Sequence, residues 1–215
     1  DKAVYVSSLI ELDKAIKGEK EIENTIKSQI EDGVALTKFI IHFKDEVKKG
    51  SDEQSLSNLL HSYREKGTHF IGESFENIVA VDSNSACMHY APSEKIHSKV
   101  DCNSSSLLID SGGQYKYGTT DTTRTFALSK PSDEFKKDYT LTLKCLIALS
   151  KAIFLDGANG RSLDGIARKF MWQEEMDYKC GTGHGVSYLG PVHEGPNGFR
   201  YKDVYMKNDG AKIVP

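Results

Sequence analysis

The sequence of 215 residues has no long hydrophobic run and no large excess of charge of one sign. No stretch approaches the ~20 apolar residues that a membrane-spanning helix needs. Charged residues interrupt the apolar positions of the first twenty residues, so we expect no secretory signal there. The formal charge of -3, from 28 basic and 31 acidic residues, provides no field to attract a nucleic acid. We therefore expect neither a membrane nor a nucleic-acid partner.

The sequence has only four cysteines, and their spacing matches neither a zinc site nor a disulfide framework. Cys87, Cys102, Cys145 and Cys180 lack the paired spacing of a zinc site and the density of a disulfide scaffold. We expect all four to be small packing residues in a reducing, cytoplasmic setting. A content of 38% hydrophobic and 27% charged residues excludes disorder as the overall state and allows one large domain.

The chain divides into a short apolar cluster and a longer domain. We interpret residues 1–18 as a remnant or linker of an upstream domain, and residues 19–215 as one domain. Between residues 19 and 50, helical spacing of apolar residues predicts one long amphipathic helix. Its predicted apolar face consists of Ile22, Ile26, Ile30, Val34, Ile41 and Phe43. Three more helices are predicted, over about 51–67 with a capping box from Ser51 to Gln54, over 132–157, and from 162 onward.

Short β-branched runs mark strands between the helices. They lie at residues 70–71, 78–81, 107–110 and 121–126. Gly112-Gly113 is typical of a turn, which predicts that the last two runs pair as an antiparallel hairpin. Helices segregated from antiparallel strands indicate an α+β fold. Residues 209–215 resemble a turn and the opening of a strand, so we expect the fold to continue past Pro215.

Asp110 and Asp121 are acids inside strand-like runs, where aspartate is disfavoured. On one hairpin their carboxylates can reach the same face, where they would repel each other unless a proton or cation lay between them. A divalent metal is the obvious candidate. An alternative is that one aspartate caps a turn and the other pairs with Arg124.

Two histidines lie in a segment rich in glycine. His184 sits between glycines that leave room for a ligand, and imidazole is the most common nitrogen ligand of metals in proteins. His193 supplies a second imidazole that can exchange a proton near neutral pH. Either ring could instead bond only to the loop backbone.

These motifs, in this order, resemble the catalytic domain of the Xaa-Pro aminopeptidases (aminopeptidase P), which are metallopeptidases. The resemblance runs from about Glu19 to Pro215 and implies the pita-bread (creatinase/aminopeptidase-like) fold, a curved antiparallel sheet covered by helices, here C-terminally truncated. It rests on residues 89–92 (HYAP), 110–115 (DSGGQY), 119–125 (TTDTTRT), the glycine-flanked His184 and residues 193–196 (HEGP).

The resemblance also implies a mechanism. Asp110 would bind one divalent ion, Asp121 would bridge two, and His184 would ligate the second. Manganese is the usual metal of the family, and zinc is a competitor. A metal-activated hydroxide would cleave the bond before proline, while His89 and His193 flank the substrate and assist as catalytic residues. The substrates would be peptides with proline at the second position, and the full-length protein could be a homodimer.

Two departures from the family pattern matter. The family contributes two further metal-binding glutamates that this chain does not contain, so we expect residues 1–215 alone to be catalytically impaired. Cys180 stands where a histidine often lines the active site. A prolidase-type dipeptidase and a non-catalytic pita-bread module that binds proteins are the rival functions. Survival of Asp110, Asp121 and His184 favours an enzyme.

Overall fold

The computed structural model describes residues 8–201, which fall into two compact units. The first unit contains residues 19–136 and 186–192. The second contains residues 137–185 with the described parts of 1–18 and 193–215. The first seven residues of the predicted segment 1–18, and the turn and strand opening predicted at 209–215, lie outside the described residues.

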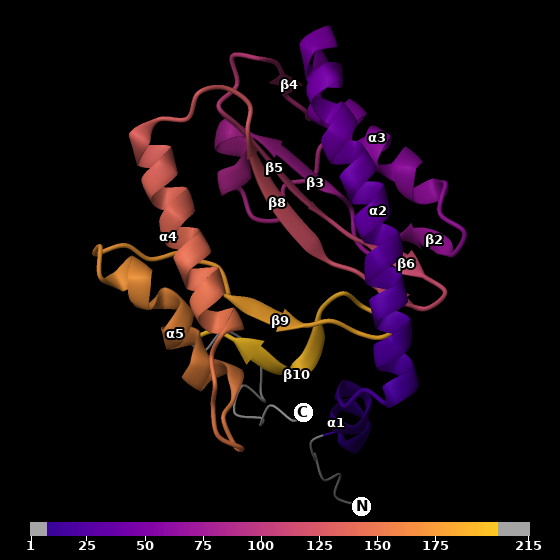
Figure 1. Ribbon diagram of the computed structural model, residues 1–215, viewed down its shortest axis with the longest axis vertical. Coiled ribbons are helices and arrows are strands. Elements are labelled where there is room, and N and C mark those ends of the chain that lie inside the picture. The colour runs from indigo at the N-terminus through magenta and orange to yellow at the C-terminus, as the bar shows by residue number, and fades with distance from the viewer. Residues whose placement is uncertain (1–7, 202–215) are drawn as a thin grey trace, which may run out of the picture. The chain divides into compact units, whose positions relative to one another are not determined.

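Two helices form one layer of the first unit (Figure 1). The predicted long helix is confirmed as α2, Glu19–Lys49, and Gly50 follows it with a φ of 89°, a left-handed conformation that favours glycine. The second predicted helix is α3, Glu53–Glu65. Its predicted cap was wrong by one residue, because Asp52 and Ser55 form the capping box in place of Ser51 and Gln54.

The strands of the first unit pair antiparallel, in agreement with the predicted α+β class. In the residues described, one three-stranded sheet has the order β3-β5-β8 and another has the order β2-β6-β7. Strands β1 and β4 form a separate two-stranded sheet. A 3-10 helix, η1, follows β3. The bounds are β1 Ser51–Asp52, β2 Phe70–Glu73, β3 Ile78–Val81, η1 Asp82–Ala86, β4 Lys99–Val100, β5 Ser106–Ser111, β6 Gly113–Tyr115, β7 Gly118–Thr119 and β8 Thr122–Ala127.

The predicted pairing of residues 107–110 with 121–126 is confirmed by β5 and β8, but the predicted tight turn was wrong. The chain between them forms its own hairpin, β6-β7, which pairs with β2 in the other sheet. Gly112 lies where the chain leaves the first sheet. A Cβ there would lie 1.9 Å from the Thr120 carbonyl oxygen, so this close approach requires glycine.

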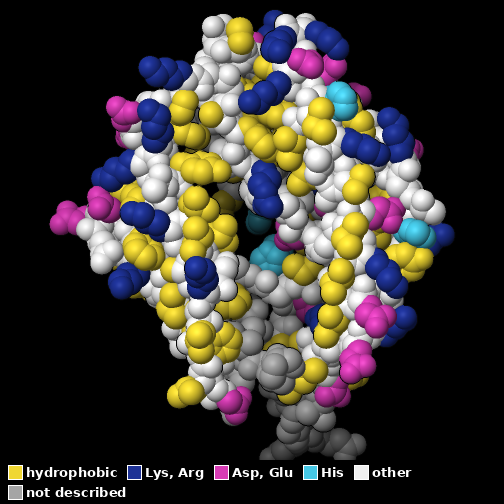
Figure 2. Space-filling model, in the orientation of Figure 1, with side chains coloured by type: hydrophobic (Ala, Val, Ile, Leu, Met, Phe, Trp, Pro, Cys, Tyr) yellow, Lys and Arg dark blue, Asp and Glu magenta, His cyan; other side chains and the backbone are white. Residues whose placement is uncertain are grey.

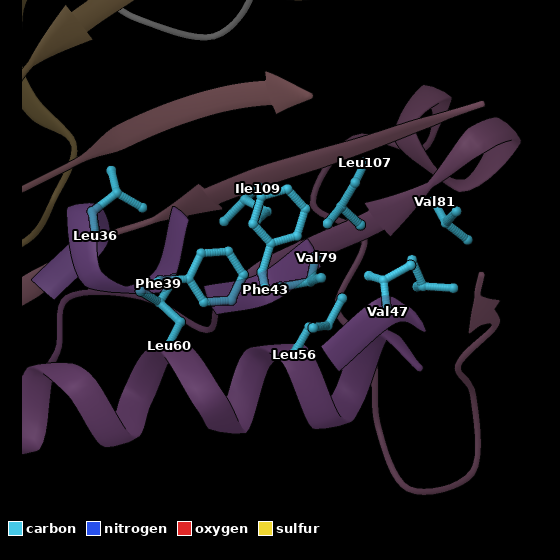
Figure 3. Close-up of a cluster of buried hydrophobic side chains, with 11 residues drawn as sticks. Leu36, Phe39, Phe43, Val47, Leu56, Leu60, Val79, Val81, Leu107 and Ile109 are labelled. Atoms are coloured by element: carbon cyan, nitrogen blue, oxygen red, sulfur yellow. The ribbon is translucent and has the colours of Figure 1, made fainter. Parts of the chain in front are cut away.

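The core of the first unit lies between its helices and the β3-β5-β8 sheet (Figure 3). Phe39 and Phe43 of α2 stack with ring centroids 5.4 Å apart, and both are fully buried. The sheet contributes Val79, Leu107 and Ile109, also fully buried. Burial of each such side chain is worth about 1.5–3 kcal/mol.

The apolar face predicted for α2 was wrong in most positions. Of its six residues only Phe43 is buried, and Figure 2 shows hydrophobic side chains along the exposed side of α2. The side that packs on the core carries two polar residues, Ser28 and Asp32, which interrupt its apolar pattern. The exposed members are Ile22 50%, Ile26 55%, Ile30 63%, Val34 49% and Ile41 63%.

The described part of the second unit contains three helices and a two-stranded sheet. Its elements are α1 Leu9–Ala15, most of α4 Asp133–Ser150, α5 Gly160–Trp172, β9 Gly183–Gly185 and β10 Glu194–Phe199. Helix α4 ends at Ser150, seven residues before the predicted end, and α5 begins two residues earlier than predicted. Leu141 and Cys145 of α4 pack with Ala167 and Met171 of α5.

The cysteine prediction holds for one residue. Cys145 is buried and free, whereas Cys87, Cys102 and Cys180 are free but exposed. Apolar packing therefore does not explain these three. Among residues 8–201, no helix combines the length and the apolar character needed to cross a membrane.

Candidate functional site

Strand register relates the two predicted carboxylate ligands. Asp110 of β5 lies opposite Thr123 of β8, and Asp121 precedes Thr123 by two residues. Asp121 lies one residue before β8 begins, and if the alternation of side chains is continued to it, Asp121 is expected diagonally across from Asp110 on the same face. Leu107 and Ile109 of β5 are fully buried in the core. Because side chains alternate along the strand, Asp110 points to the opposite face, away from that core.

The Asp110 carboxylate is incompletely satisfied. Its Oδ1 atom is buried and has no hydrogen-bond partner among the residues described. A buried carboxylate oxygen without a donor is costly, and a cation is one way to offset that cost. Asp110 therefore fits a metal ligand better than a turn cap, and no ion pair between Asp110 and Arg124 is described, since the Arg124 guanidinium donates to the Thr123 carbonyl.

The second unit brings the two predicted histidines together. His184 lies on β9 and His193 directly precedes β10, and their ring centroids are 4.0 Å apart in an edge-to-face arrangement. His184 Nδ1 donates to the Gly185 carbonyl oxygen at 2.9 Å. A carbonyl only accepts, so the lone pair of the neutral His184 ring lies on Nε2, the nitrogen that could bind a metal.

Arg168 holds the segment that leads into β9, and the sequence analysis did not single it out. This buried residue of α5 donates to Asp164 at 2.7 Å and to Asp177 at 2.6 Å. It also donates to the carbonyls of Tyr178 and Cys180. The i, i+4 spacing of Asp164 and Arg168 on a helix was the available signal. Cys180 thus contributes a backbone acceptor and is itself exposed.

A pocket of about 200 Å³ lies beside His184 in the second unit. Glu194 at its edge pairs with Lys17 and, at 3.2 Å, with Lys14. Burial raises the pKa of Glu194, but the two lysines outweigh it and the net pKa is lowered. Glu194 is therefore occupied as an ion-pair partner and anchors the α1 segment. The pocket is lined by Leu12, Ala15, Ile16, Lys17, His184, Gly185, Glu194, Gly195, Pro196, Asn197 and Phe199.

The remaining predicted site residue, His89, lies in an exposed loop of the first unit. Its φ of 56° is rare for a residue other than glycine. Asp110 and Asp121 belong to the same unit, whereas His184 and His193 belong to the second. Among residues 8–201, no group of three or more His, Cys, Asp or Glu side chains could hold a metal ion as arranged. The five assignments stay predictions.

Comparison with known proteins gives relatives over nearly the whole chain. It is 43% identical over 209 residues to a probable Xaa-Pro aminopeptidase P of Tuber melanosporum, covering 96% of this chain and 34% of the relative. The chain thus spans about a third of the length of such curated relatives.

Two solved structures share the fold. An X-prolyl aminopeptidase from Caenorhabditis elegans, described as a cytosolic enzyme with a di-nuclear active site, matches with a TM-score of 0.87 and 34% identity, over 96% of this chain and 33% of the other. An Xaa-Pro dipeptidase from Bacillus anthracis matches with a TM-score of 0.77 and 28% identity, over 91% and 52%. The chain has the expected pita-bread fold. The sequence profile of metallopeptidase family M24 matches residues 24–215, and the chain belongs to that family.

Proposed function

We propose that this chain supplies catalytic residues of a metal-dependent aminopeptidase that removes the N-terminal residue preceding proline. The observation that carries the proposal is the buried Asp110 Oδ1, which has no hydrogen-bond partner among the described residues and belongs to β5, which pairs with β8, the strand that begins directly after Asp121. Membership of a metallopeptidase family and 43% identity to a probable Xaa-Pro aminopeptidase P support it.

We assign Asp110, Asp121 and His184 as ligands of two divalent ions, with Asp121 bridging. Carboxylate oxygens and a single imidazole suit Mn²⁺, and Zn²⁺ is the competing choice. When bound, such a pair would polarise the scissile carbonyl and lower the pKa of a water molecule. The di-nuclear site named for the Caenorhabditis elegans enzyme supports the number of ions.

We assign His89 and His193 to the substrate. Imidazole can donate a proton near neutral pH, and the nitrogen that leaves from an Xaa-Pro bond has to be protonated. Within a peptide, proline lacks an N–H group and its ring is rigid, so the pocket that binds the substrate's proline must recognise the shape of the ring. The 4.0 Å separation of the His193 and His184 rings supports a place for His193 close to the metal ligands.

The alternative is a prolidase-type dipeptidase, because the Bacillus anthracis enzyme has the same fold. The higher identity to aminopeptidase P relatives favours the aminopeptidase. A non-catalytic module is less favoured because Asp110, Asp121 and His184, the ligands that we propose, are all retained. We further propose a cytosolic location and peptide substrates with proline second, and we leave a homodimer as a prediction for the full-length protein.

The test compares Asp121→Asn with Asp156→Asn, the same change at an exposed position, in the full-length protein. Mn²⁺ content and hydrolysis of Arg-Pro-Pro and Gly-Pro are measured. We expect Asp121→Asn to lose metal and turnover while Asp156→Asn keeps both. Cleavage of Gly-Pro alone would indicate the dipeptidase, and metal binding without cleavage of either peptide would indicate the binding module. Full activity of Asp121→Asn would refute the bridging assignment.

A further inference from the structure

Glu53 is a buried carboxylate that the proposed mechanism does not use. It is the first residue of α3, and its exposed fraction is 0%. Four groups donate to it, and each carboxylate oxygen accepts two of them. Oε1 accepts from Val81 N at 2.8 Å and Asn84 Nδ2 at 2.9 Å. Oε2 accepts from Tyr90 Oη at 2.6 Å and Ser98 N at 2.7 Å. Every described donor is neutral, and together they fill the carboxylate's acceptor sites.

These donors enclose the segment that carries His89. Asn84 and Tyr90 lie at the two ends of a seven-residue segment, and each binds a different oxygen of the same carboxylate. Between them the chain makes two consecutive turns, from Cys87 N to the Asn84 carbonyl and from Tyr90 N to the Cys87 carbonyl. His89 lies directly before Tyr90 in the left-handed conformation, which persists only where surrounding contacts determine it.

The base of the segment is fixed as well. Glu53 N donates to the Ser98 carbonyl at 3.1 Å, and β1 pairs with β4 beside it. Asp82 Oδ1 accepts from Ser105 N and Ser106 N at the start of β5, the strand of Asp110. The segment is thus tied to α3 and to β5 within one unit.

We infer that Glu53 is a positioning residue, which fixes the loop of His89 through Asn84, Tyr90 and Ser98 so that this imidazole meets the substrate. The inference rests on the proposed substrate role of His89. It assigns Glu53 no contact with substrate or metal. A loop set in advance loses less entropy when substrate binds, and a small displacement of a catalytic group is costly.

The test uses four variants of the full-length protein. Tyr90→Phe removes one donor and keeps the ring. Glu53→Gln leaves one oxygen acceptor and directs an amide NH₂ at groups that are themselves donors. Glu94→Gln is the matched control, because Glu94 is exposed on the same loop with no described hydrogen bond. His89→Ala provides the background in which the effects of Tyr90→Phe and Glu53→Gln are repeated.

We expect Tyr90→Phe and Glu53→Gln to lower kcat/KM for Arg-Pro-Pro by about 10- to 100-fold without changing Mn²⁺ content. In the His89→Ala background, neither should lower it further. Hydrogen exchange of residues 84–98 should be faster in both and unchanged in Glu94→Gln. If Glu53→Gln fails to fold, Tyr90→Phe alone decides.

Two results would overturn the inference, and they are distinguishable. If His89→Ala is impaired but Tyr90→Phe costs the same factor in both backgrounds, Glu53 acts independently of His89 and only the inference falls. If His89→Ala has wild-type kcat/KM, the proposed role of His89 falls with it.

Discussion

Buried carboxylates in this chain differ in how they are satisfied. Asp32 accepts from Arg64 at 2.7 Å and from Tyr115 at 2.8 Å, and Asp164 accepts from Arg168. Glu53 accepts only from neutral donors. Asp110 Oδ1 is buried with no hydrogen-bond partner among the described residues, and Asp110 has no described ion pair, whereas Glu194, whose Oε1 also lacks a hydrogen bond, lies in ion pairs with Lys14 and Lys17. A bound cation would offset the cost of leaving the Asp110 oxygen without a donor.

Replacement of Asp110 should therefore separate stability from metal binding. In metal-free protein, we expect Asp110→Asn to leave the free energy of unfolding unchanged or to raise it by about 1 kcal/mol, because an unpaired buried charge is removed. Mn²⁺ should raise the Tm of the wild type and have little effect on the variant. Thermal unfolding in EDTA and in Mn²⁺ measures both. Equal Mn²⁺-induced shifts would show that Asp110 is not a ligand.

Tyr90 should report the environment of Glu53. Burial first, and then the hydrogen bond and charge of Glu53, raise the pKa of Tyr90 to about 12 from the ordinary value of 10.0. Because the folded-state pKa is raised, the associated stability is complete below pH 10 and is lost as the pH rises through about 12. Selective ¹³Cζ-tyrosine NMR can follow the titration. Glu53→Gln should move this pKa toward 10, and an unmoved value would contradict the contact.

The sequence did not suggest Glu53 as a functional residue. In the stretch Ser51-Asp52-Glu53-Gln54-Ser55 it reads as an exposed acid in the first turn of a helix. Its partners lie 28 to 45 residues away along the chain, so only the fold shows that it is buried. Asp110, Asp121, His184 and His193 could be proposed from the sequence because each stands in an unusual local context.

Among the elements, α2 shows how far periodicity can be trusted. The alternation of charged and apolar residues predicted the helix and its end, but not the face that packs. Isoleucines four residues apart form a continuous apolar row that lies on the exposed side. The opposite side buries Phe39 and Phe43 together with Asp32, whose charge is neutralised by Arg64 from α3. A partner 32 residues away cannot be inferred from periodicity.

Two glycines should respond in opposite ways to alanine. Gly33 is exposed within α2, and a Cβ there would meet nothing within 4 Å. Gly33→Ala should stabilise the fold by about 0.5–1 kcal/mol. Gly112→Ala should destabilise it by about 1–3 kcal/mol, because its Cβ would collide with the Thr120 backbone. Urea unfolding midpoints measure both, and equal signs would contradict the packing around Gly112.

At the scale of the whole molecule, the chain is about a third as long as its curated relatives. The fold class could be predicted because it depends on local patterns. The β5-β8 pairing was predicted correctly, although the tight turn on which that prediction rested is wrong. The β6-β7 hairpin could not be predicted, because Gly112-Gly113 has the sequence of a tight turn. The pairing of β6 with β2 is a long-range contact that local sequence does not show.

Residues 1–215 made alone should bind Mn²⁺ more weakly than the full-length protein. Three predicted donors, Asp110, Asp121 and His184, leave much of the coordination of two ions to water. Isothermal titration calorimetry on both forms, with Asp121→Asn as the reference for lost binding, tests this. Equal affinity and stoichiometry in the two forms would show that these donors suffice.

Because the partners of Glu53 are neutral, the loop that carries His89 should tolerate high ionic strength. Ion pairs near the surface, such as the one between Lys14 and Glu194, weaken as ionic strength rises, because at 1 M salt charges are screened within about 3 Å. N–H and O–H groups that bind a fully buried carboxylate carry no net charge for the salt to shield. The His89 loop should therefore keep its conformation at salt concentrations that weaken the ion pair between Lys14 of α1 and Glu194.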